Sequence, residues 1–171
     1  MLTLILLRHA KSSWDDPGLS DEQRPLNARG RRDAPRMGRW LVTHGLIPKR
    51  ALVSPATRAR QTFEELSRPW PARPAATILP ELYVFHDAAP IIAAIREHGG
   101  AADPLLVIGH NPALHELARR LAGGAIDRFP TCAAAVFHVE TDVWRAFPDA
   151  PVRLARFMRP KALPNGDKTS R

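Results

Sequence analysis

Two arginines and two histidines stand just beyond short apolar runs in this sequence: Arg8, His9, Arg58 and His110. Two arginines that share a pocket repel each other unless an anion joins them, and their planar guanidinium groups match the oxygens of a phosphate. A neutral histidine beside them can attack phosphorus as a nucleophile, because nearby cations disfavour the protonated ring. A second histidine can stabilise the charge of the transition state. These residue types indicate phosphoryl chemistry.

The elements that must position these residues alternate along the chain. Helical patterns separate the first four apolar runs and follow the fourth, which predicts an α/β fold. The last two apolar runs follow each other without a helix, which predicts a mixed sheet. We therefore expect a three-layer sandwich with a central, mixed and mostly parallel sheet and helices on both faces. The expected strands are 3–7, 51–54, 76–79, 104–109, 133–140 and 151–158, and the expected helices are 30–43, 55–66, 90–97 and 112–121.

Ligands of open α/β sheets bind beyond the carboxyl ends of the strands. Two more polar residues stand at such positions, Glu81 after the third expected strand and Asn111 after the fourth. Helix N-termini at Arg58 and Asn111 would add backbone donors for the same anion. We expect Asn111 to join the phosphate-binding residues and regard Glu81 as a candidate proton donor.

Local signals set several expected boundaries. Asn27 is a plausible helix cap, and Pro55 and Pro112 are expected in the first turns of their helices. The length of 171 residues fits one domain, which we expect over residues 1–160. The polar end, residues 161–171, has little to bury, and we expect a mobile tail there.

The bulk composition narrows the class of protein. No apolar run approaches a membrane span, the N-terminal stretch lacks the features of a signal peptide, and Cys132 is the only cysteine, so we expect a cytoplasmic protein without a membrane partner. The net charge is +8, and basic residues gather between Arg24 and Arg39. No aromatic residues interleave there as a base-stacking surface requires, so we expect no nucleic-acid partner. Whether this run binds another partner, and the oligomeric state, stay open.

Three motifs together resemble a known family. "LRHAKS" (residues 7–12), "SPATRARQT" (54–62) and "IGHNP" (108–112) are similar to motifs of the histidine phosphatase superfamily, which includes phosphoglycerate mutases. "RPLNARGRRDA" (24–34), "ILPEL" (78–82) and the short length resemble its SixA group of phosphohistidine phosphatases. The resemblance covers residues 2 to about 120. It implies that His9 is phosphorylated, that Arg8, Arg58 and His110 form the phosphate pocket, and that no metal or other cofactor is needed. Glutamate after a strand is the proton donor of some members, which is the role considered for Glu81.

The motifs of cysteine-based phosphatases, zinc hydrolases and nucleotide-binding enzymes are absent from the sequence. Cys132 has no arginine at C-x5-R spacing, His115 does not complete H-E-x-x-H, and no phosphate-binding glycine loop is present. Three readings stay open. The favoured one is hydrolysis of protein-borne phosphohistidine, and the second is a small-molecule phosphate-ester phosphatase or mutase of the same superfamily. The third, of a different class, is a non-catalytic module that binds phosphoproteins.

Overall fold

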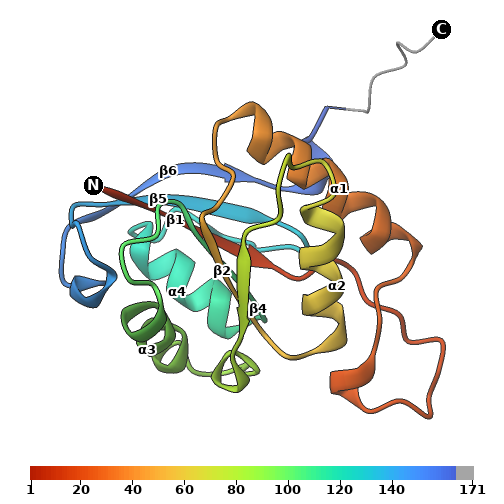
Figure 1. Ribbon diagram of the computed structural model, residues 1–171. Helices are drawn as coiled ribbons and strands as arrows, with labels where there is room; N and C mark the ends of the chain where they lie inside the picture. Colours follow the sequence, from red (N-terminus) through yellow and green to blue (C-terminus); the bar gives the residue numbers. More distant parts are fainter. Residues whose placement is uncertain (165–171) are drawn as a thin grey trace, which may run out of the picture.

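A single mixed sheet forms the centre of the protein. The computed structural model describes residues 1–164 and contains a six-stranded sheet in the order β3-β2-β4-β1-β5-β6. The four neighbours β3, β2, β4 and β1 are parallel to one another. β5 is antiparallel to both of its neighbours, β1 and β6, which gives the mixed sheet predicted from the missing crossover helix (Figure 1). The strands are β1 (Leu2–Arg8), β2 (Arg50–Val53), β3 (Ala75–Ile78), β4 (Leu105–Gly109), β5 (Ala134–Val139) and β6 (Val152–Met158).

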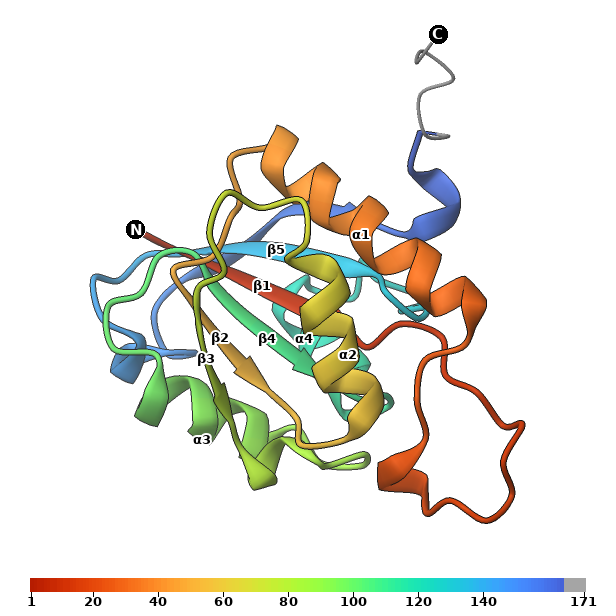
Figure 2. The ribbon, with the colours of Figure 1, turned by 45° about the vertical axis from the view of Figure 1, so that its right-hand side comes forward.

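Four α-helices cover the two faces of this sheet. α1 (Ala28–Thr43) and α2 (Thr57–Leu66) pack together on one face, and α3 (Ala89–His98) and α4 (Ala113–Leu121) lie on the other (Figure 2). The predicted three-layer α/β sandwich is therefore confirmed. Among residues 1–164, no helix is long and apolar enough to cross a membrane.

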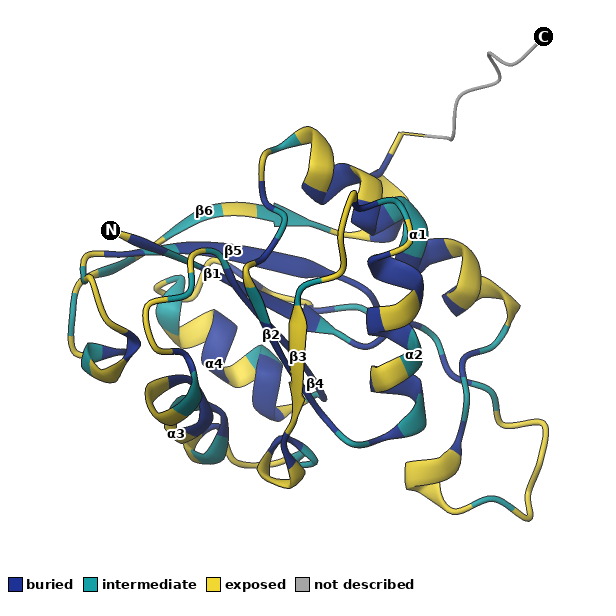
Figure 3. Ribbon diagram, viewed as in Figure 1, coloured by how far each residue is buried: buried dark blue, intermediate teal, exposed yellow. Residues whose placement is uncertain are grey.

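The alternation of side chains in β1 shows why both faces must be covered. Leu4 and Leu6 join the core under α3 and α4, whereas Ile5 and Leu7 join the core under α1 and α2. All four side chains are fully buried, and the central strands form the dark interior of Figure 3. Since successive residues of a strand point to opposite faces, a continuous apolar run fits only a strand buried on both sides. The strand that carries Arg8 and His9 at its end is thus held rigidly.

The first residues of α1, α2 and α4 can be compared with the helix starts expected from the sequence. The side chain of Asn27 accepts a hydrogen bond from the backbone N–H of Gly30, so the predicted cap of α1 is confirmed. The expected first-turn prolines are wrong by one or two positions. Pro112 is the N-cap of α4, and Pro55 precedes the N-cap of α2 because the backbone at Ala56, with φ −56° and ψ 138°, is not yet helical.

The chain beyond β6 begins with packed residues. A 3-10 turn, η4 (Pro160–Ala162), leads to Leu163, which is buried against residues of α1. Arg36 of α1 donates to the carbonyl oxygens of Pro160 and Leu163, both at 3.5 Å. The first residues of the expected mobile tail are therefore fixed by contacts with α1. Residues 165–171 of that expected tail lie outside the described residues.

Candidate active site

The carboxyl ends of three parallel strands bring the predicted chemistry together. The register pairs Arg8 of β1 with Gly109 of β4, and Val53 of β2 with Ile108 of β4. The residues that follow these strands therefore meet at one edge of the sheet. The rings of His9 and His110 lie with their centroids 5.1 Å apart.

His9 is held with one ring nitrogen free. Its side chain is buried, and Nδ1 lies 2.7 Å from the backbone oxygen of Ala10. A carbonyl oxygen can only accept, so Nδ1 carries the ring proton and Nε2 of the neutral ring keeps its lone pair. Burial, together with the nearby charges of Arg58 and Arg8, lowers the pKa of His9 to about 3. The ring is therefore neutral at pH 7 and can act as a nucleophile through Nε2.

The imidazole ring of His110 contacts the hydroxyl group of Ser54, a residue that the sequence analysis did not single out. Nε2 of His110 lies 2.7 Å from Oγ of Ser54, and Nδ1 is buried without a hydrogen-bond partner among the described residues. Burial, followed by the charge of Arg58, lowers the pKa of His110 to about 3. When the Ser54 hydroxyl donates to Nε2, Nδ1 carries the ring proton. An unpaired buried donor is costly, so Nδ1–H is suited to an incoming oxyanion.

The guanidinium group of Arg58 is buried at the start of α2, and its outer edge is occupied. Nη1 donates to the backbone oxygen of Asp21 at 2.6 Å, and Nη2 donates to Oδ2 of Asp21 at 2.9 Å. Nε has no hydrogen-bond partner within residues 1–164. The edge formed by Nε–H and the second Nη2 hydrogen therefore remains for an anion, in the bidentate geometry that suits phosphate.

Asp21 links this arginine to further side chains that the sequence did not single out. Its Oδ2 also accepts the hydroxyl of Tyr83 at 2.5 Å, and its Oδ1 accepts Nη2 of Arg24 at 3.1 Å. Burial raises the pKa of this carboxyl, but the hydrogen bonds from Tyr83 and Arg58 outweigh burial and lower the pKa to about 2. The ring of Tyr83 packs edge-on against His110. Asp21 begins a short 3-10 turn, η1 (Asp21–Gln23), in the polar segment between β1 and α1, so only its ionisable side chain could have drawn attention to it.

Arg8 and Asn111 meet at one backbone oxygen. Arg8 Nη1 and Asn111 Nδ2 both donate to the carbonyl of Phe129, at 3.2 and 2.7 Å. Nε of Arg8 is buried without a partner among the described residues. Burial, and then the charge of Arg58, lower the pKa of Arg8, because the two arginines lie close together. This contact holds the Asn111 side chain beside Arg8 through one hydrogen of Nδ2, and the phosphate-binding role expected of Asn111 stays a prediction.

Two backbone donors at the start of α4 are engaged. The N–H of Ala113, the first residue of this helix, donates to the carbonyl oxygen of Phe85. The next N–H, that of Leu114, donates to the carbonyl oxygen of His110. These two donors are therefore not free for an anion, whereas the N–H of Asn111 has no hydrogen-bond partner among the described residues, and its expected role as a donor to the anion stays a prediction.

Glu81 does not join the cluster through any described contact. It lies in the 3-10 turn η2 (Pro80–Leu82), and its Oε1 is 3.5 Å from Nε2 of His98 at the end of α3. No hydrogen bond or ion pair among residues 1–164 connects this carboxylate to Arg8, His9, Arg58 or His110. The structure therefore brings together the two arginines and the two histidines, and gives Glu81 a partner elsewhere.

Comparisons with known proteins show which family this chain is similar to. A family model, histidine phosphatase superfamily (branch 1), matches residues 4–82. The phosphohistidine phosphatase SixA of Escherichia coli is 32% identical over 126 residues, which cover 72% of this chain and 76% of that protein. The solved structure of SixA from Nakamurella multipartitia has a TM-score of 0.83 at 26% identity, over 94% of this chain and 97% of that one. A structure of the protein histidine phosphatase SixA complexed with tungstate has a TM-score of 0.78 at 27% identity, over 95% of this chain and 100% of that one.

Proposed function

The chain belongs to the histidine phosphatase superfamily and is a phosphatase, and we propose that it hydrolyses protein-borne phosphohistidine through a phosphorylated His9. The SixA proteins to which the chain is similar support this choice of substrate. The free Nε2 of His9, fixed by the contact between Nδ1 and Ala10, supports the choice of nucleophile. We assign phosphate binding to Arg8, Arg58 and His110.

The reaction that we propose has two balanced steps. Nε2 of His9 forms a bond to phosphorus while the P–N bond of the substrate breaks, and the departing imidazole of the substrate takes a proton from solvent. Water then attacks the phosphorus on His9, the bond to Nε2 breaks, and inorganic phosphate leaves with the proton of the water transferred to phosphate or solvent. Arg8, Arg58 and Nδ1–H of His110 stabilise the charge on the phosphoryl oxygens in both steps.

The proposed preference for phosphohistidine rests on whether the carboxyl groups near the site can donate a proton to the leaving group. Both carboxylate oxygens of Asp21 accept hydrogen bonds, from Arg58, Tyr83 and Arg24, which keeps this group ionised, and Glu81 contacts His98. An alkoxide leaving group needs a proton from an acid, whereas an imidazole nitrogen, with an ordinary pKa of about 6.5, is readily protonated by solvent. A site with an ionised carboxylate beside its arginine therefore favours P–N over alkyl P–O cleavage.

Phosphate release from three substrates tests this proposal: a phosphohistidine protein, phosphoramidate and an alkyl phosphate. We expect the kcat/KM of the purified protein to be highest for the phosphohistidine protein. Rapid quenching should trap acid-labile phosphate on the peptide that contains His9, and His9→Asn should abolish both the trapping and the turnover. A higher kcat/KM for alkyl phosphates would assign the chain to the small-molecule phosphatases. Tight binding of the phosphoprotein without phosphate release would favour a binding module.

A further inference from the structure

A cavity lined by cationic side chains adjoins the candidate active site through Arg8. It has a volume of about 400 Å³, and Arg8 is one of its lining residues. Besides Arg8, four parts of the chain form its walls: the start of α1, His115 of α4, the loop before β5, and the segment around η4. The cations Arg29, Arg128, Arg159 and Lys161 come from α1, the loop before β5 and the segment around η4. A volume of this size accommodates one or two side chains or a small anionic group.

The charges around this cavity are poorly balanced by protein groups. Asp127 is the one carboxylate that lines it, against five cations including Arg8. Arg29 lies 3.5 Å from Asp33 and is partly neutralised by it. Arg128, Arg159 and Lys161 are exposed and form no ion pair within residues 1–164. Cations that converge without carboxylate partners attract an anion from outside the chain.

The position of the cavity relates it to the substrate. Arg8 reaches the carbonyl oxygen of Phe129, which belongs to the cavity wall, and its charge also acts on His9. An anion in this cavity and a phosphoryl group at His9 would therefore lie on either side of one guanidinium group. A substrate that carries a second negative group near its phosphoryl group could occupy both places at once.

We propose that this cavity is a subsite for acidic side chains that flank the phosphohistidine of the carrier protein. This inference rests on the proposed function, because it assumes a protein substrate whose phosphoryl group is transferred to His9. Carboxylates on such a carrier complement Arg128, Arg159 and Lys161, and increase the affinity for the carrier without contributing to the chemical step. The cavity thus selects among phosphohistidine proteins by the charge next to the modified residue.

Two matched phosphohistidine peptides test the subsite. One carries glutamate at the positions around the phosphohistidine, and the other carries glutamine at the same positions. The wild-type chain should hydrolyse the acidic peptide with about tenfold higher kcat/KM, mainly through a lower KM, and the preference should shrink as salt is added. Equal kcat/KM values for the two peptides would overturn the subsite.

A triple variant, Arg128→Gln with Arg159→Gln and Lys161→Gln, removes the unpaired cations and leaves Arg8 and Arg29 in place. We expect it to lose the preference for the acidic peptide while its rate on phosphoramidate, which has no second anion, stays unchanged. A preference that survives in this variant would also overturn the proposal. Failure of the proposed function is recognised separately, since neither peptide nor phosphoramidate would then be hydrolysed. Binding of an unphosphorylated glutamate peptide, compared between wild type and variant by calorimetry, would still report on the cavity.

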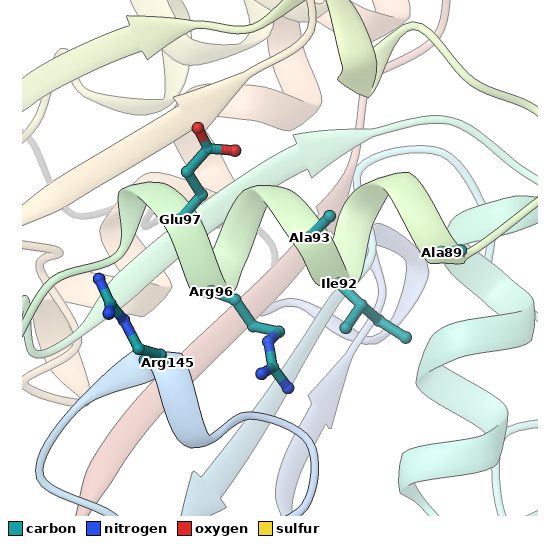
Figure 4. A pocket seen from close by; sticks show the side chains of 6 residues that line it. All are labelled: Ala89, Ile92, Ala93, Arg96, Glu97 and Arg145. Carbon is teal, nitrogen blue, oxygen red and sulfur yellow. The ribbon is translucent and has the colours of Figure 1, made fainter.

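A second triple variant serves as the control for lost positive charge. Arg39, Lys49 and Arg145 are exposed, and they lie towards the end of α1, before β2, and in the 3-10 turn η3 (Trp144–Ala146), at the opposite edge of the sheet from His9. Arg145 borders a different cavity, of about 480 Å³, beside Arg96 and Ile92 of α3 (Figure 4). Changing these three residues to glutamine alters the net charge by the same amount. It should leave the peptide preference intact, and an equal loss of preference would show that overall charge, not the cavity, decides it.

Discussion

Asp21 holds Arg58 by two hydrogen bonds, one from Nη1 to its backbone oxygen at 2.6 Å and one from Nη2 to its Oδ2 at 2.9 Å. Because Asp21 also accepts from Tyr83 and Arg24, the carboxylate is fixed from three sides. The buried guanidinium is therefore oriented before any substrate binds. Its Nε–H edge is left free for a phosphoryl group.

Asp21→Asn should loosen Arg58 without removing it. An amide keeps the shape and one oxygen acceptor but loses the charge, so we expect kcat/KM to fall by about tenfold, with weaker inhibition by inorganic phosphate. Steady-state kinetics and phosphate inhibition constants measure both effects. Asp15→Asn, in the same loop and exposed, is the control and should change neither. Tighter phosphate binding in Asp21→Asn would mean that Asp21 competes with substrate for Arg58 instead of orienting it.

Arg58→Lys tests whether the planar fork, and not only the charge, is needed. Lysine cannot contact Asp21 and two phosphoryl oxygens in the same bidentate way, so kcat/KM should fall about tenfold or more. Arg60→Lys, two residues further along α2 on an exposed side chain, should stay close to the wild-type value. An Arg58→Lys protein with unchanged kinetics would return this residue to a structural role.

The low pKa values of His9 and His110 predict how stability depends on pH. Both fall from about 6.5 to about 3 on folding, so below pH 6.5 the unfolded chain binds more protons than the folded one. The free energy of unfolding should therefore decrease as the pH falls from about 6.5 towards 3, by up to about 1.4 kcal/mol per pH unit for each ring. Urea unfolding between pH 7 and pH 5 measures this slope before most carboxylates titrate.

Histidine variants show how much of this pH dependence of the free energy of unfolding comes from His9. His9→Asn should make the decrease between pH 6.5 and pH 5 shallower, because one ring no longer has to stay neutral. His86→Asn, an exposed histidine without a described partner, should leave the slope as in wild type. A slope that is the same in all three proteins would show that the His9 pKa is not lowered in the folded state.

Catalysis should not depend on a divalent metal. The two arginines repel a cation from the place where the phosphoryl group binds, and residues 1–164 contain no group of three or more His, Cys, Asp or Glu side chains that could hold a metal ion. Incubation with EDTA should leave kcat unchanged, and vanadate, an oxyanion that resembles a phosphoryl group in transfer, should inhibit. Loss of activity on chelation that a divalent ion restores would contradict this expectation.

Glu81→Gln should affect all substrates little and equally. The carboxylate contacts His98 at 3.5 Å, so its loss should change kcat/KM by less than about twofold for both alkyl phosphates and phosphohistidine. Glu97→Gln, which removes the other carboxylate near His98, is the control. A large loss confined to alkyl phosphates would make Glu81 the leaving-group acid, as first considered from its position after a strand.

The strands, the layers and the main site residues could be predicted because their signals are local. The run Leu4 to Leu7 is apolar at every position, which requires burial on both faces, and the run ends at Arg8 and His9. Parallel strands separated by helices must then align their carboxyl ends, so residues after β1, β2 and β4 meet. The prolines were placed less well, because a proline before a helix fixes its own backbone but not the residue where the helix begins.

The partners of the site residues were decided by the tertiary structure alone. Asp21 meets Arg58 across 37 positions of the sequence, and Ser54 meets His110 across 56. Asn111 turns to the carbonyl of Phe129, and Glu81 to His98. The contact between Ser54 and His110 follows from the register of β2 and β4, which the sequence does not specify. The other contacts depend on how the connecting segments pack at the ends of the strands, and their conformation has no repeating pattern that a sequence could display. The sequence by itself therefore determined which groups stand at the ends of the strands, whereas the tertiary structure decided which side chains hold and orient them.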